Sequence, residues 1–79
     1  MQQAKRPIYR IAQEIFLYWP NVYFGAKPYL TIMLGLSDIT DVYGFDSARS
    51  IINYFLANAA SFKGPEARRL KTELKTIIK

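Results

Sequence analysis

The stretch GPEARRLKTELKTIIK, residues 64–79, is the clearest indication of the fold, because its apolar residues recur at helical spacing. Pro65 suits the first turn of a helix, where a missing N–H leaves no bond unmade. Glu66 follows it, and a carboxylate is favourable near the positive end of the helix dipole. The pattern predicts a helix with an apolar side and a cationic side. The apolar side consists of Ala67, Leu70, Leu74, Ile77 and Ile78, and the cationic side of Arg68, Arg69, Lys71, Lys75 and Lys79.

The same periodicity predicts two helices in the first half of the chain. The first covers residues 7–19, and Pro20 ends it because the residue before a proline is pushed out of the helical region. The second covers residues 29–36, directly after Pro28. This second helix is apolar nearly all round, which is typical of a helix at the centre of a bundle.

A further helix is predicted for residues 48–62, with Asp46 or Ser47 as its N-cap. Between the second and third helices, residues 37–44 are expected to form a short turn of helix that ends at Gly44. No segment shows the alternation of apolar and polar residues that indicates a half-buried strand. The sequence therefore predicts an all-α fold.

The length of 79 residues indicates one small domain, residues 1–79, with residues 1–6 loosely held. We expect a bundle of four helices with a short helical turn between helices 2 and 3. The chain has no cysteine and no histidine, which excludes disulfides and the usual zinc sites. Six tyrosines, five phenylalanines and one tryptophan are a large aromatic content for so short a chain, and they suit either a packed core or an interface.

The net charge of +5 is unevenly distributed along the chain. Residues 1–10 carry +3, residues 11–62 carry −2 and residues 63–79 carry +4. If helix packing brings the two ends together, they form one positive face that fits nucleic acid, an acidic protein surface or anionic lipid. The plain alternative is a solvated surface that keeps an apolar small protein soluble.

Catalytic chemistry is not indicated. Without histidine or cysteine, the serines have no partner of the usual kind to activate them. The four glycines are isolated and form no phosphate-binding loop. Asp38, Asp41 and Asp46 lie near expected helix starts, where capping explains them. We therefore expect a protein that is not an enzyme and that has no cofactor and no metal site.

Neither a secretory leader nor a membrane span is expected. Pro7 and Glu14 interrupt the apolar run that a leader needs. The longest apolar run, residues 29–36, is far shorter than the ~20 residues that cross a bilayer. These observations favour a cytoplasmic protein that does not use a membrane.

The basic helix at the end of the chain has three interpretations. It could meet an acidic protein patch, with aromatic anchors beside the cations. It could contact nucleic-acid phosphates without reading sequence. It could also be an ordinary last helix whose cations favour its C-terminal end. The protein-binding set comprises Arg68, Arg69, Lys71, Lys75, Trp19 and Tyr23, and the nucleic-acid set comprises Lys5, Arg6, Arg10, Arg68, Lys71, Lys75 and Lys79.

Two further features could take part in binding. Residues 18–24 are rich in aromatic side chains, for which packing beneath a loop is the favoured interpretation and an exposed binding surface the alternative. The helix over residues 48–62 has a side of small residues that would permit close approach of another helix or of a partner. Leu17 lies with the polar residues of its helix, so a homo-oligomer that buries Leu17 and the small-residue side is a further alternative.

Residues 23–30 (YFGAKPYL), 43–51 (YGFDSARSI), 54–56 (YFL) and 67–69 (ARR) resemble small uncharacterised proteins carried by phages and plasmids. The similarity covers most of residues 7–78. It implies a context and no residue roles: one-domain phage proteins without enzymatic activity are often inhibitors of host machinery, including anti-CRISPR proteins. A basic inhibitor would occupy an acidic protein surface or a nucleoprotein complex of the host cytoplasm, since mimicry of DNA calls for an acidic chain.

Overall fold

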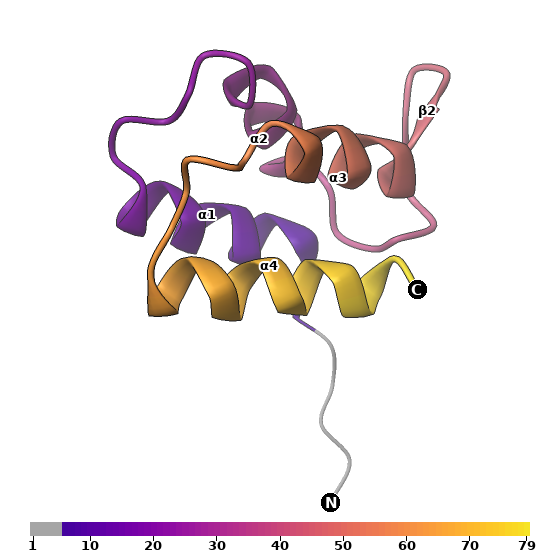
Figure 1. The fold of residues 1–79 in the computed structure, drawn as a ribbon. Helices are drawn as coiled ribbons and strands as arrows, with labels where there is room; N and C mark the ends of the chain where they lie inside the picture. Colours follow the sequence, from indigo (N-terminus) through magenta and orange to yellow (C-terminus); the bar gives the residue numbers. More distant parts are fainter. Residues whose placement is uncertain (1–5) are drawn as a thin grey trace, which may run out of the picture.

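The computed structural model describes residues 6–79, which fold into four helices and one short β-hairpin (Figure 1). Over this range the fold is predominantly helical, as predicted, but it is not a pure four-helix bundle. The helices are α1 (Ile8–Tyr18), α2 (Lys27–Met33), α3 (Ala48–Ala57) and α4 (Pro65–Ile77), and the strands are β1 (Val42–Tyr43) and β2 (Asp46–Ser47).

The helices form two layers around one apolar core. Helices α1 and α4 lie side by side, and the pair α2 and α3 covers them from one side (Figure 1). The core takes fully buried side chains from every helix, and none of the described residues buried in it is polar or charged. Its largest members are Phe55, Ile8, Ile11, Ile15, Leu30, Met33, Ile51, Ile52, Leu70 and Leu74.

The last helix and the start of the third confirm the sequence-based prediction. Gly64 precedes α4 with a φ of +109°, and Pro65 begins the helix. Ser47 caps α3, since its hydroxyl accepts the backbone N–H of Ser50 at 3.1 Å. The predicted apolar stripe of α4 faces the core. Its buried members are Ala67, Leu70, Leu74 and Ile77.

The helical turn predicted for residues 37–44 is wrong, because a β-hairpin stands in its place. The carboxylate of Asp41 accepts the backbone N–H groups of Ser37 at 2.7 Å and Asp38 at 3.1 Å, so these donors are satisfied without a helix. Gly44 has a φ of +63°, the sign that a type II′ turn requires at its first central position. Strands of two residues are too short to show alternation, which is why no strand was predicted.

Two helix boundaries also differ from the prediction. Helix α2 occupies residues 27–33 instead of 29–36, with Pro28 inside its first turn. It buries only Leu30 and Met33, so it is not the central helix expected from its composition. Helix α3 ends at Ala57 instead of Phe62, although Phe62 is still buried by the turns that follow.

Candidate functional site

One side of α4 carries an ion-pair network that joins it to α1. The Nη2 atom of Arg69 lies 2.6 Å from Glu66 and 3.0 Å from Glu14. Arg6 holds Glu73 through two hydrogen bonds of 2.6 and 2.9 Å, and its Nη1 atom lies 2.7 Å from Glu14. Two arginines and three carboxylates are therefore linked across the α1–α4 boundary, and together they carry a net charge of about −1. We refer to these five residues as the ion-pair network.

The network shifts the pKa values of its members. The Arg69 guanidinium, and after it that of Arg6, lowers the pKa of Glu14 below its usual range. The hydrogen bonds that Arg6 donates to Glu73 raise the pKa of Arg6, and those that Arg69 donates to Glu66 and Glu14 raise the pKa of Arg69. The shifted pKa values keep Glu14, Arg6 and Arg69 ionised near neutral pH. Arg6 and Arg69, both predicted as binding residues, thus hold the fold together in this structure.

A different side of α4 carries cations without a counter-charge. Lys63, Arg68, Lys71 and Lys75 have no carboxylate within 4.0 Å in the part of the chain that the structure describes. Burial lowers the pKa of Lys71, and the neighbouring charges of Lys75 and Lys63 lower it further. The Lys71 ammonium is therefore partly desolvated, and no carboxylate of the described residues pairs with it.

Three of these cations surround a surface hollow of about 360 Å³, which we name the basic hollow. The Lys71 Nζ atom lies 5.7 Å from the centre of the Phe62 ring, within the range of a cation–π contact. The hollow thus combines an apolar floor with a cationic rim. Its lining residues are Phe62, Lys63, Gly64, Ala67, Arg68 and Lys71.

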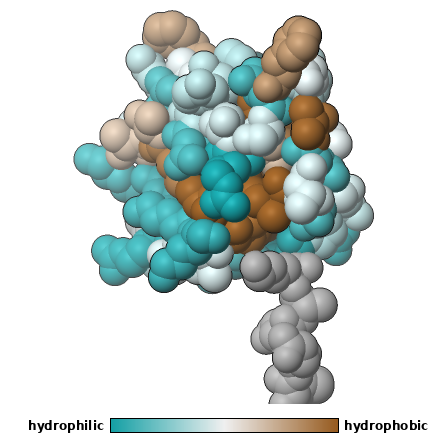
Figure 2. Space-filling view, turned by 90° about the vertical axis from the view of Figure 1, so that its right-hand side faces the viewer, coloured by the Kyte–Doolittle hydropathy of each residue, from teal (hydrophilic) through white to brown (hydrophobic). Residues whose placement is uncertain are grey.

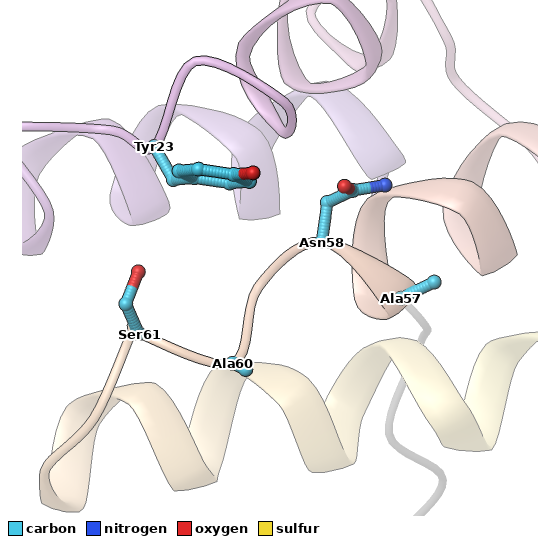
Figure 3. A pocket seen from close by; sticks show the side chains of 5 residues that line it. All are labelled: Tyr23, Ala57, Asn58, Ala60 and Ser61. Atoms are coloured by element: carbon cyan, nitrogen blue, oxygen red, sulfur yellow. The ribbon is translucent and has the colours of Figure 1, made fainter.

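A second hollow, of about 340 Å³, lies where the loop after α1 meets the end of α3 (Figure 3). The Tyr23 ring forms one wall, and the opposite wall comes from small side chains at the end of α3. The side-chain amide of Asn58 donates to the carbonyl of Tyr54 at 2.9 Å, which fixes its position. We name this the tyrosine hollow. Its lining residues are Tyr23, Ala57, Asn58, Ala60 and Ser61.

Gly25 permits the close packing that builds the tyrosine hollow. A Cβ atom at Gly25 would lie 2.6 Å from the Tyr23 ring and 2.9 Å from the side-chain oxygen of Asn58. Any larger residue would therefore displace the ring. Tyr23 and the small-residue side of α3 are separate features of the sequence, and the structure brings them together.

The two hollows share the connection between α3 and α4. Ala60 and Ser61 line the tyrosine hollow, while Phe62 and Lys63 line the basic hollow. A partner that covers this connection would reach both. We therefore treat the two hollows as one candidate binding surface.

Trp19 lies beneath this surface and is not part of it. Its side chain is only 8% exposed, and it stacks on Phe62 with ring centres 4.9 Å apart and packs edge-on against Phe55 at 6.3 Å. This corrects the prediction of Trp19 as an anchor for a partner. The residue is part of the core because the turn after α3 folds Phe62 back over it.

The remaining predicted residues are spread over the surface. Arg10 is exposed on α1, Lys79 is exposed at the end of the chain, and Lys5 lies outside the described residues. The Leu17 side chain is 71% exposed, so no loop of the described chain covers it, and its burial in a homo-oligomer stays a prediction. The structure therefore groups Arg68, Lys71 and Tyr23 around the candidate surface and leaves the other cations elsewhere.

The hairpin is the exposed apolar feature that the sequence analysis missed. The side chains of Val42 and Tyr43 are 64% and 56% exposed, and Phe45 is fully exposed. The face shown in Figure 2 includes apolar side chains that project from the molecule. A glycine between two aromatic residues, Tyr43-Gly44-Phe45, is the local signal that could have indicated a tight turn with an exposed tip.

Comparisons with known proteins found no matching family model, no matching curated protein and no matching solved structure. Residues 6–79 contain no group of three acidic, cysteine or histidine side chains placed to bind a metal ion. Among the helices of this range, none has the length and apolar character needed to cross a membrane.

Proposed function

We propose that this chain is a non-catalytic binding protein that docks on an acidic surface of a protein partner. One observation carries the proposal: Lys63, Arg68 and Lys71 remain uncompensated around the basic hollow, whereas Arg69, the next residue after Arg68, is fully paired. Uncompensated cations raise the local positive potential and speed encounter with an acidic surface.

The two hollows would contribute different interactions to binding: the tyrosine hollow offers contact area, and the basic hollow offers positive charge. Tyrosine is favoured at the centre of interfaces because it gives a large rigid contact area and a hydroxyl. Tyr23, which is 44% exposed, offers such a contact beside small side chains that a partner can approach closely. A partner carboxylate placed over the basic hollow would give Lys71 the counter-charge that it lacks in the free protein.

We further propose that the partner belongs to a host defence complex such as CRISPR–Cas, and that the protein inhibits it in the host cytoplasm. The support for this step is the resemblance of the chain to small phage and plasmid proteins. The basic surface supports inhibition by direct docking, because it suits an acidic protein surface or a nucleoprotein complex. A basic surface does not imitate DNA.

A capture experiment with matched variants tests the binding surface. The tagged full chain is exposed to a host lysate beside the double variant Arg68→Glu/Lys71→Glu and the control Lys27→Glu/Arg49→Glu. The control changes the net charge equally at two exposed positions whose side chains line neither hollow. We expect the first pair of substitutions to abolish capture and the control to retain it. Equal loss in both variants, or retention in both, would contradict the proposed surface.

Nucleic acid is the second candidate partner, and the same unpaired cations favour it. Four cations near the basic hollow, Lys63, Arg68, Lys71 and Lys75, make no ion pair within the described residues, and four phosphate contacts predict a log–log slope of affinity against salt of about −3 to −4. Labelled single- and double-stranded DNA and RNA are titrated at two salt concentrations. Micromolar binding that collapses as salt rises would replace the protein partner with nucleic acid, and absence of binding at low salt would exclude this candidate.

A further inference from the structure

The hairpin segment carries an excess of acidic side chains. Residues 37–49, which contain the hairpin, carry three aspartates and one arginine. Hydrogen bonds from the backbone of Ser37 and Asp38 lower the pKa of Asp41, so this carboxylate is ionised at neutral pH. The connection that carries the basic hollow lies at the other end of the view in Figure 1. The acidic hairpin segment and the basic hollow therefore lie at different places on the same molecule.

The hairpin presents an aromatic ring and a carboxylate side by side on a firm base. The base is held where the backbone N–H of Ala48 donates to the carbonyl of Asp41 at 2.9 Å. At the tip, Phe45 is fully exposed and Asp46, the next residue, is exposed as well. Phe45 therefore contributes nothing to the core, and together with the exposed Val42 and Tyr43 it forms an apolar patch on the hairpin, the kind of feature that marks a contact site.

The charges around the hairpin decide what it can meet. Asp38, Asp41 and Asp46 would be repelled by nucleic-acid phosphates and by an anionic membrane. They favour a hollow with an apolar floor and a cationic rim. This chain itself offers such a hollow, with Ala67 and the Phe62 ring in its floor and Arg68 and Lys71 at its rim.

We propose that the hairpin tip of one copy docks in the basic hollow of a second copy. Phe45 would lie against the apolar floor, and the Asp46 carboxylate would meet Lys71 and Arg68. Each copy has one hairpin and one hollow, so the contact is head-to-tail and can continue from copy to copy. The proposal shares one premise with the proposed function, that the basic hollow receives acidic groups, and self-docking would compete with a partner for this hollow.

The test is self-association of the full chain by sedimentation at low ionic strength, from about 10 µM to about 1 mM, where charge pairing is least screened. We expect the apparent mass to rise with protein concentration and to return to that of the monomer in high salt. Phe45→Ala and Lys71→Glu should each remain monomeric, whereas Leu17→Ser should associate like the original chain. Circular dichroism confirms that the variants are folded.

Mixing the two monomeric variants gives the decisive result. Phe45→Ala retains an intact hollow and Lys71→Glu retains an intact hairpin, so their mixture should form one-to-one pairs that cannot grow further. A monomer at every concentration, self-association that survives Phe45→Ala, or a mixture without pairs would each overturn the proposal. A chain that stays monomeric yet captures a partner would overturn self-docking alone. A chain that self-associates but captures nothing would overturn the proposed function alone.

Discussion

Arg68 and Arg69 are neighbours in the sequence, but they lie on different sides of α4 and have different surroundings. Arg69 points toward α1 and shares Glu14 with Arg6. Arg68 lines the basic hollow and meets no carboxylate in the described part of the chain. The comparison shows that the number of cations on a helix does not measure its capacity to bind. What counts is which cations the fold leaves without a counter-charge.

The largest effect is expected on the buried apolar stripe of α4, which lies between the side that forms ion pairs and the side whose cations are unpaired. Leu70→Ala should lower the free energy of unfolding by about 2–5 kcal/mol, because a fully buried leucine leaves a cavity when it is truncated. Urea unfolding measures this loss. Thr72→Ala, an exposed change on the same helix, is the control and should stay within about 0.5 kcal/mol. Equal values for both variants would contradict the packing of α4 against the core.

On the paired side, Glu14→Gln should lower the free energy of unfolding by about 1 kcal/mol, which allows for solvent screening of a partly exposed group. Glu14 is the residue to change because it serves both arginines. The loss should shrink in high salt, and thermal unfolding at two salt concentrations measures it. Gln13→Glu, the reverse change at the neighbouring exposed position, is the control. A stability unchanged by Glu14→Gln would show that the network adds nothing to the fold.

The pH dependence of the unfolding temperature tests the ion-pair network in a second way. The pKa of Glu14 is lower in the folded than in the unfolded protein, since Arg69 and Arg6 hold its charged form. Its contribution is therefore present in full above the ordinary glutamate value of about 4.3, and it is lost as the pH falls through the lowered folded value. The unfolding temperature of the original chain should fall below about pH 4, and that of Glu14→Gln should fall less steeply. Parallel pH profiles would contradict this assignment.

The smallest effect is expected on the unpaired side. Arg68→Glu should change the free energy of unfolding by no more than about 0.5 kcal/mol, because Arg68 is exposed and makes no ion pair that the substitution could break. Thermal unfolding beside the binding measurements checks it. A loss as large as that of Glu14→Gln would mean that both sides of α4 support the fold, and the distinction between them would fail.

Local patterns in the sequence determined the helical character of the chain. The apolar stripe of α4, its start at Pro65 and the Ser47 cap of α3 follow from residues a few positions apart, so periodicity and capping chemistry predicted them. The large apolar residues of these helices also form the core as expected. The hairpin was missed because two-residue strands leave no periodic pattern and depend on the conformation of Gly44.

Only the tertiary structure decided which predicted binding residues are free. Arg6 meets Glu73 across 67 residues of sequence and Arg69 meets Glu14 across 55, so no local pattern could show that these charges cancel. The burial of Trp19 depends in the same way on Phe62, which the turns after α3 carry back over it. A helix pattern states which side chains share a face. What that face meets is determined by packing between segments far apart in the chain.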